Sequence, residues 1–384
     1  MADTHYFDYA AATPLEPTVL TAMLPYFKEQ FYNPSSQYLA AKNIRQVVET
    51  ARADVAQVLG VRPSEVIFTA GGTEANNLAI QGVARLFPGA HLVTTALEHD
   101  SVIAPIRALG KQGWRVSEVA PKQDGVVDAV SLLAAVTDDT VLVSVMYANN
   151  EIGTIQPIKE IAAGLKRIRE TRKAEGNGRP LYFHTDACQA ANYLDLHVHR
   201  LGVDLMTLNG GKIYGPKQSG VLVVCGGLEL QPLVYGGGQE LNRRSGTENV
   251  AGIIGFANAL QFVTRDRKDE TERLHALQQL LIHELLTTLP NVRINGSLKH
   301  RLPNNVHITI PGADNERLLY ELDEAGIQAA TASACSASKE EVSHVLHALG
   351  LSDNEARASL RFSMGRQTTE QAVRTLVKTL AKRA

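Results

Sequence analysis

Two charged residues in this sequence follow apolar runs and could act on a ligand that carries a carbonyl group or a cationic ring. Lys212 follows the run 203–209 and two glycines, a setting that can partly desolvate the amine and favour its neutral, nucleophilic form. Lys217 lies beyond a Gly-Pro turn and is the weaker candidate. Asp186 ends the run 181–187, where a carboxylate needs a partner because burying it unpaired is costly. That partner could be an arginine, a helix N-terminus or a protonated heterocyclic nitrogen.

Other apolar runs are also followed by residues that could bind a ligand. Gly72 and Thr73 precede a helical pattern, so this turn could bind an anion through helix N–H groups or could be an ordinary turn capped by threonine. His99 and Asn150 follow two further runs, although a lone histidine there is often structural and Asn149-Asn150 could form a turn. An amine, a carboxylate and a phosphate-binding turn on successive strand ends are together the set that pyridoxal phosphate requires.

The apolar runs predict the sheet that would position these residues. They are short, mostly continuous and rich in Val, Leu and Ile, as is typical of buried strands in a mostly parallel sheet with helices on both faces. The runs are 65–70, 91–96, 140–148, 181–187, 203–209 and 219–225. Ligands of such sheets bind beyond the carboxyl ends of the strands, so we expect the candidate residues to meet there.

The C-terminal third predicts a smaller α+β domain. Its expected elements are a helix at 269–289, a strand at 305–310, a helix at 315–325, a loop through Cys335 and another helix. Thr368 and Gln371 predict a capping box at the start of the last helix. We expect a large α/β domain at 16–255 and a smaller domain formed by 1–15 and 256–384.

The bulk composition is that of a globular protein and excludes several classes of function. A formal net charge of -2 gives no pull towards nucleic acid or anionic membranes. No stretch of about 18 apolar residues predicts a membrane span, and the N-terminal residues lack the pattern of a signal peptide. Three widely spaced cysteines argue against a disulfide framework or a zinc site. We therefore expect a cytoplasmic protein without a metal, a direct nucleic-acid partner or a membrane partner.

The order of these motifs resembles the NifS/IscS branch of the cysteine desulfurases, which are fold-type I pyridoxal-phosphate enzymes. The resemblance covers nearly the whole chain, and its most specific segments are 71–74, 149–153, 212–217, 244–247 and 333–338. It implies a large domain with a mostly parallel seven-stranded sheet sandwiched by helices. It also implies a smaller α+β domain with a catalytic cysteine loop at about 329–338, and a homodimer.

The resemblance implies a reaction in which L-cysteine becomes L-alanine and its sulfur is transferred to the enzyme. Lys212 would carry pyridoxal 5'-phosphate as a Schiff base and act as general base. Cys335 would receive the sulfur as a persulfide, whereas Cys188 and Cys225 are interpreted as buried structural residues. His99 would stack on the cofactor ring and shuttle protons. The persulfide would pass to an acceptor protein, either an iron–sulfur scaffold or a tRNA-thiolation protein.

The resemblance also assigns residues to the cofactor and the substrate. Asp186 would pair with the ring nitrogen and Gln189 with the ring hydroxyl. The remaining cofactor-binding residues are those near the phosphate or the ring, namely Gly72, Thr73, His99, Asn150, Asn209, Gly211 and, from the second subunit, Thr247. Asn150 and Arg361 would hold the substrate carboxylate, although Arg361 could equally be a structural ion-pair residue.

Two departures from the family pattern concern the cofactor and the acceptor. The family usually has Ser-x-His-Lys where this chain has Asn209-Gly210-Gly211-Lys212, so a hydroxyl and an imidazole near the phosphate are missing. Their loss would weaken cofactor binding by about 1–3 kcal/mol. The chain also stops at Ala384, without the extension that IscS-type members use near their scaffold partner.

Two alternative functions stay open from the sequence. The first is another reaction on the same fold, such as that of a selenocysteine lyase or an aminotransferase. An aminotransferase needs no loop cysteine, so alanine formation without sulfide or persulfide would favour it. The second is a cofactor-poor relative that serves as a binding scaffold, which the missing serine and histidine would favour.

Overall fold

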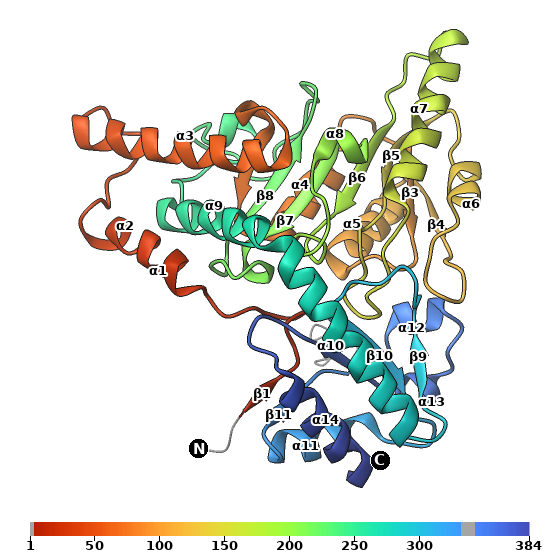
Figure 1. Cartoon of the computed structure of the whole chain (residues 1–384). Coiled ribbons are helices and arrows are strands. Elements are labelled where there is room, and N and C mark those ends of the chain that lie inside the picture. The colour runs from red at the N-terminus through yellow and green to blue at the C-terminus, as the bar shows by residue number, and fades with distance from the viewer. Residues whose placement is uncertain (1–3, 332–341, 384) are drawn as a thin grey trace.

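The computed structural model describes residues 4–331 and 342–383. Within these residues a seven-stranded sheet lies between helices, and a smaller group of helices and strands lies below it in the view of Figure 1. The strands of the large sheet are β2 (Val66–Thr69), β3 (His91–Thr95), β4 (Arg115–Val119), β5 (Thr140–Ser144), β6 (Tyr182–Asp186), β7 (Leu205–Asn209) and β8 (Gly220–Val224). The predicted seven-stranded, mostly parallel sheet is confirmed.

The strand order brings the carboxyl ends of most strands to one edge. The order is β2-β8-β7-β6-β5-β3-β4, and neighbours from β7 to β4 are parallel. β8 is antiparallel to both β2 and β7, so β2 runs in the direction of the parallel strands. All strands except β8 therefore end at the same edge, which is where a ligand is expected in such a sheet.

All six predicted runs form strands, whereas β4 was not predicted. β4 lies at the edge of the sheet, and its burial pattern is a mixture of exposed and half-buried residues. Arg115 and Glu118 on this strand contact other polar side chains instead of a core. Because β4 lacks the continuous apolar run of a central strand, the pattern that found the other strands could not find it.

Helices cover both faces of the large sheet. On one face, α4 (Gly72–Ala84) and α5 (Asp100–Lys111) share a buried cluster with apolar side chains of the sheet. The other face is covered by α3 (Leu39–Leu59), α6 (Ala129–Ala134), α7 (Ile158–Ala174), α8 (Val198–Leu201) and α9 (Val250–Arg265), together with α1 (Pro17–Met23). Each fully buried Val, Leu or Ile contributes about 1.5–3 kcal/mol, so these two clusters hold the strand ends in place.

Elements from both ends of the chain form the smaller part. A three-stranded antiparallel sheet is formed by β9 (Arg293–Asn295), β10 (Asn305–Thr309) and β12 (Ser359–Ser363), while β1 (His5–Tyr6) pairs with β11 (Ile327–Gln328). The helices are α10 (Arg267–Thr288), α11 (Asn315–Glu324), α12 (His344–Ala348), α13 (Asp353–Ala356) and α14 (Glu370–Arg383). Phe7 packs with α10, α11 and α14 in one apolar cluster, which ties the N-terminal segment to the C-terminal third.

Helix α9 crosses the predicted domain boundary after residue 255. Its residues Phe256 and Val263 still pack in the cluster that covers the large sheet. Leu274, on the following helix α10, packs in the cluster of the smaller part instead. The packing therefore favours a boundary near Asp266, and the division into two domains stays a prediction.

The predicted cap of the last helix is wrong by one residue. The hydroxyl of Thr369 accepts a hydrogen bond from the N–H of Ala372 at 3.2 Å, which is the capping interaction. The hydroxyl of Thr368 accepts from the N–H of Gly365 at 3.0 Å and so belongs to the preceding turn.

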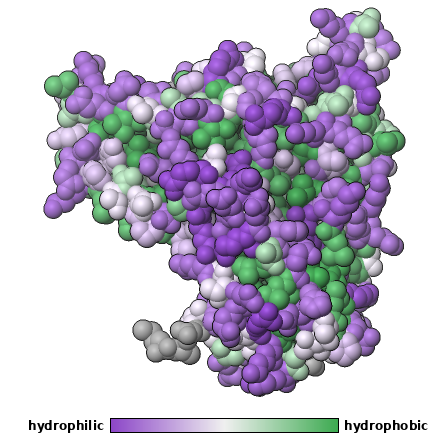
Figure 2. All heavy atoms as spheres, viewed as in Figure 1, coloured by the Kyte–Doolittle hydropathy of each residue, from purple (hydrophilic) through white to green (hydrophobic). Residues whose placement is uncertain are grey.

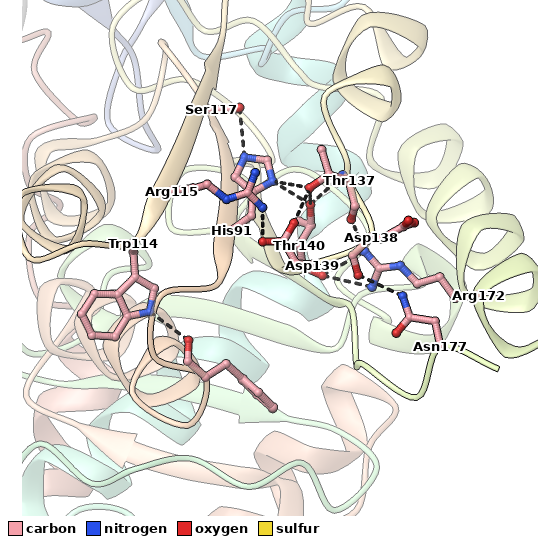
Figure 3. Close-up of polar contacts among 11 residues, drawn as sticks. His91, Trp114, Arg115, Ser117, Thr137, Asp138, Asp139, Thr140, Arg172 and Asn177 are labelled. Atoms are coloured by element: carbon pink, nitrogen blue, oxygen red, sulfur yellow. Dashed lines mark hydrogen bonds and ion pairs between the residues drawn. The ribbon is translucent and has the colours of Figure 1, made fainter. Parts of the chain in front are cut away.

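A polar network holds the amino ends of β3, β4 and β5 together (Figure 3). The ring of His91 contacts the hydroxyls of Thr140 at 2.7 Å and Ser117 at 3.0 Å. Arg172 donates to the carbonyl oxygen of Thr140 at 3.0 Å, and Arg115 pairs with Asp139. This network lies at the edge opposite to the strand ends that carry the candidate residues. It therefore stabilises the sheet and, within the described residues, makes no contact with the candidate site.

Candidate active site

The turn between β2 and α4 has the geometry of an anion-binding helix start. Gly71 is the N-cap residue, and its φ of 136° is one that only glycine adopts readily. A Cβ on Gly72 would lie 2.8 Å from the sulfur of Cys188, so a larger residue here would have to displace that sulfur. Thr73 lies inside the first helical turn, and the alternative in which it caps the turn is wrong. First-turn N–H groups lack intrahelical acceptors, so they can bind an anion.

Beyond the carboxyl ends of the strands lies a cavity of about 130 Å³. Most of the predicted site residues line it, namely Gly72, Thr73, His99, Asn150, Asp186, Gln189, Asn209, Lys212 and Arg361. Gly211 lines an adjoining depression of about 580 Å³, together with Gly72, Thr73, Asn209 and Lys217. Residues from β2, β3, β5, β6, β7 and β12 or the turns that follow them are thus brought to one place.

Two predicted residues are not placed in this cavity. Thr247 lines a separate cavity of about 210 Å³, with Arg244 and residues of β2 and α9. Cys335 lies outside the described residues, as does most of the predicted loop that carries it.

Asp186 ends β6 and presents a buried carboxylate to the cavity. The residue is 6% exposed. Oδ2 accepts a hydrogen bond from Nδ2 of Asn76 at 2.7 Å, and Oδ1 accepts from the N–H of Cys188 at 2.9 Å. Both donors are neutral, and each carboxylate oxygen has a second lone pair. A protonated ring nitrogen would therefore find an anionic acceptor here, as the cofactor requires.

Lys212 lies in the single helical turn that follows β7, and its amine reaches the cavity. Nζ donates to the carbonyl oxygens of Ala10 at 2.7 Å and Ala11 at 2.6 Å. Lys217, the weaker candidate, donates to the carbonyl oxygen of Thr13 at 2.6 Å and lines only the adjoining depression. The geometry therefore favours Lys212 as the amine that could meet a carbonyl group in the cavity.

His99 caps helix α5 at the end of the β3 segment. Its Nδ1 accepts from the N–H of Ser101 at 3.1 Å and lies 2.7 Å from the hydroxyl of the same residue. Burial lowers the pKa of His99 below its ordinary value, which favours the neutral ring. Gln189 donates through Nε2 to Ala10 at 2.9 Å, so its amide is also held at the cavity wall.

Arg361 lies on β12 and is 2% exposed. One terminal nitrogen donates to Oδ1 of Asp8 at 2.7 Å, and the other donates to the carbonyl oxygen of Asn150 at 3.0 Å. Its Nε is buried without a hydrogen-bond partner in the described structure. Arg361 is thus both a member of an ion pair and a cationic wall of the cavity.

Sequence reasoning missed two polar residues that line this cavity and a third, Glu98, that precedes His99 in the sequence. Asn76 and Ser101 line the cavity and bond to Asp186 and His99. Glu98 is buried, and this burial raises its pKa to about 8. Asn76 lies within the glycine-threonine motif and Glu98 lies beside His99. Their closeness in sequence to predicted site residues could have identified them.

The fold and the cavity define a class of pyridoxal-phosphate enzymes, and the comparisons agree. Residues 5–376 match the aminotransferase class-V family model, and the chain belongs to this family. It is 41% identical to the cysteine desulfurase IscS of Dictyoglomus turgidum over 368 residues, which are 95% of this chain and 91% of that protein. The cysteine desulfurase IscS of Methanosarcina thermophila is also 41% identical, over 96% of this chain and 89% of that protein.

The solved structures point to the same group. A NifS-like protein superimposes with a TM-score of 0.91 and 31% identity, over 99% of both chains. Within the class-V family, the chain therefore belongs with the cysteine desulfurases. The predicted family and fold class are confirmed.

Proposed function

We propose that this protein is a pyridoxal-phosphate-dependent cysteine desulfurase that converts L-cysteine to L-alanine and passes the sulfur to Cys335. The observation that carries the proposal is the cavity in which Lys212, Asp186 and Arg361 meet beyond the strand ends. The amine of Lys212 suits the carbonyl group of the cofactor, and the buried carboxylate of Asp186 suits its ring nitrogen. The guanidinium of Arg361 suits the carboxylate of the substrate. The relatives named cysteine desulfurase support the choice of substrate.

The residues present fit the cofactor. The helix start at Gly72 and Thr73 suits its phosphate, Asp186 suits its ring nitrogen and Gln189 suits its ring hydroxyl. Oδ1 of Asn209 accepts from the N–H of Gly211 at 3.0 Å, which leaves its Nδ2 as the group that can donate to the phosphate. When bound, the cofactor supplies an aldehyde that condenses with amines and a ring that accepts an electron pair.

The chain's own residues then have distinct tasks. Arg361 binds the substrate carboxylate, and Lys212 removes the proton from the substrate's Cα. The thiolate of Cys335 attacks the substrate sulfur. An S–S bond forms as the bond between Cβ and sulfur breaks, and the electron pair of that bond stays on Cβ. Cβ takes a proton and Lys212 returns a proton to Cα, so alanine is released and Cys335 holds a persulfide.

The proposed assembly is a homodimer in which each chain completes the other's cofactor site. Thr247 lines a cavity separate from that of Lys212, which suits a role in the second subunit's site. The face of the molecule shown in Figure 2 is mainly hydrophilic, yet large apolar side chains are exposed along residues 20–39, which include parts of α1 and α3, all of α2 (Pro25–Lys28) and the segments between them. They are Leu20, Leu24, Phe27, Phe31, Tyr38 and Leu39. Such a patch suits a second copy of this chain.

The proposed sulfur acceptor is an iron–sulfur scaffold or a tRNA-thiolation protein, and the proposed location is the cytoplasm. Among the helices within 4–331 and 342–383, none has the length and apolar character needed to cross a membrane.

The test of this function is product analysis with L-cysteine. The proposal expects equal amounts of alanine and sulfide when a thiol reductant releases the persulfide. With pyruvate added as amino acceptor, alanine without sulfide or persulfide would favour an aminotransferase. Turnover of selenocysteine but not of cysteine would favour a selenocysteine lyase. Purified protein that binds no pyridoxal phosphate would favour the scaffold alternative.

A further inference from the structure

Four side chains in the cavity wall form one hydrogen-bonded chain from α5 to β6. Nδ1 of His99 lies 2.7 Å from Oγ of Ser101, and Nδ2 of Asn76 lies 2.9 Å from the same Oγ. The same Nδ2 lies 2.7 Å from Oδ2 of Asp186. Asn76, Ser101 and Asp186 are buried, and all four residues line the cavity.

The direction of each hydrogen bond follows from one backbone group. The N–H of Ser101 can only donate, and it points at Nδ1 of His99 from 3.1 Å. Nδ1 must therefore be an acceptor, so a neutral ring carries its proton on Nε2. The hydroxyl of Ser101 can bond to an acceptor only by donating. Its oxygen lone pairs are then left to accept from Asn76.

The hydrogen bonds between Asn76 and Asp186, at the other end of this series, require the same donor and acceptor roles. Nδ2 of Asn76 has two hydrogens, and it donates one to Ser101 and one to the carboxylate of Asp186. A flipped amide would place Oδ1 against that carboxylate. In the present orientation Oδ1 of Asn76 is buried without a partner in the described structure. If Nδ1 of His99 were protonated, its N–H would face the N–H of Ser101, and two donors cannot bond to each other. All the hydrogen bonds in this series can therefore form only when His99 is neutral.

We propose that Ser101 and Asn76 are positioning residues that hold His99 neutral, with its proton on Nε2. His99 then acts as a hydrogen-bond donor in the active site and does not carry a proton through the reaction. Proton transfer to and from the substrate falls to Lys212. The statement about the reaction rests on the proposed function, whereas the statement about the ring rests on these contacts alone.

The surroundings of His99 act in the same direction. Burial lowers the pKa of His99, and its electrostatic interactions with Lys212 and His344 lower that pKa further. Asp186 and Asp100 oppose this effect without reversing it. His99 also caps the N-terminus of α5, where the helix dipole disfavours a cation.

The first test is nitrogen NMR of the full chain with ¹⁵N-labelled histidine, with and without bound pyridoxal phosphate. His99→Gln identifies the signals of His99. We expect a protonated Nε2 and an unprotonated Nδ1 in both forms between about pH 6 and pH 9. A proton on Nδ1, or a charged ring within this range, would overturn the proposal. This result does not depend on turnover. A protein in which His99 is neutral with its proton on Nε2, but which has no desulfurase activity, would refute the proposed function and support this inference.

The second test changes the chain of hydrogen bonds. Ser101→Ala removes a donor that stabilises the neutral ring, so the titration midpoint of His99 should rise, and Ser101→Thr should restore it. An unchanged midpoint in a folded Ser101→Ala protein would contradict a positioning role. His99→Gln keeps an N–H donor but cannot carry a proton. It should reduce kcat by less than about tenfold, whereas loss of a proton carrier costs about 10²–10⁴-fold and would refute the proposal.

Discussion

Arg361 on β12 and Asp8 beyond β1 form an ion pair with a nitrogen–oxygen distance of 2.7 Å. The pair joins two residues that are 353 positions apart in the sequence, and Arg361 lines the cavity beyond the strand ends. Because the carbonyl oxygen of Asn150 holds the other terminal nitrogen, the guanidinium is oriented before a substrate arrives. Arg361 can therefore form the ion pair with Asp8 and also contact the substrate carboxylate, as proposed.

Arg361→Lys should weaken substrate binding. A lysine ammonium lacks the planar pair of donors that matches a carboxylate, and we expect KM for L-cysteine to rise about 10- to 100-fold. Steady-state kinetics measure the change. Arg301→Lys is a matched control, because Arg301 is a buried arginine of the smaller part that does not line the cavity. An unchanged KM in Arg361→Lys, with KM also unchanged in the control, would remove Arg361 from the substrate site.

Gly211→His should tighten the binding of pyridoxal phosphate. The nearest atoms to a Cβ at Gly211 would be Oδ1 of Asn209 at 3.5 Å and atoms of Lys217 from 3.7 Å, which are ordinary van der Waals contacts, so there is room for a Cβ. An imidazole beside the phosphate should add about 1–3 kcal/mol, which is about 5- to 150-fold in Kd. Absorbance titration of the cofactor-free protein measures Kd. Gly178→His, at a position with open space around the Cβ, should leave Kd unchanged. Equal Kd values for both variants would show that the phosphate lies elsewhere.

Cys335→Ser should abolish persulfide formation and leave the cofactor colour intact. The expectation follows from its proposed role as sulfur acceptor, since serine cannot hold a persulfide. Cys225→Ser is the control. The thiol of Cys225 is half-buried and its pKa is raised to about 12, chiefly by burial, so it is a poor nucleophile. Persulfide labelling with mass spectrometry distinguishes the two variants. A persulfide on Cys188 or Cys225 in the wild-type protein would contradict the assignment.

Glu98 should make the protein less stable as the pH rises. Burial raises its pKa from 4.5 in the unfolded chain to about 8 in the folded protein. Between these values the folded state holds a proton that the unfolded state has released, so the free energy of unfolding falls with pH. The fall due to Glu98 between about pH 6 and pH 8 is about 2 kcal/mol.

Glu98→Gln should remove that fall, because an amide does not titrate in this range. One carboxylate oxygen of Glu98 accepts from Thr95 and from the N–H of Met146, and the glutamine carbonyl can accept the same bonds. Urea unfolding at both pH values compares the two proteins. An equal pH dependence in wild type and variant would mean that Glu98 is ionised in the folded state.

Local patterns predicted the strands and the residues at their ends. The apolar runs that end near Asp186 and Asn209 are buried on both faces, so composition alone revealed them. The same patterns could not distinguish the direction of β8, because a buried antiparallel strand has the same composition as a parallel one.

Contacts between distant residues were beyond such patterns. Asn76 bonds to Asp186 across 110 positions, and Arg361 pairs with Asp8 across 353. No spacing rule connects residues that far apart, because the contacts depend on the order of strands in the folded sheet. The resemblance supplied roles for Lys212 and His99, but only the structure showed which neighbours hold their side chains.

The most direct test of the proposed function is an absorbance spectrum of the purified protein before and after addition of L-cysteine, with assays of alanine and sulfide. A visible cofactor band that changes with L-cysteine and yields both products is the predicted result. It would show that the site binds pyridoxal phosphate and works as a desulfurase despite Asn209 and Gly211. A colourless protein that stays inert with added pyridoxal phosphate would contradict the account and favour a scaffold role.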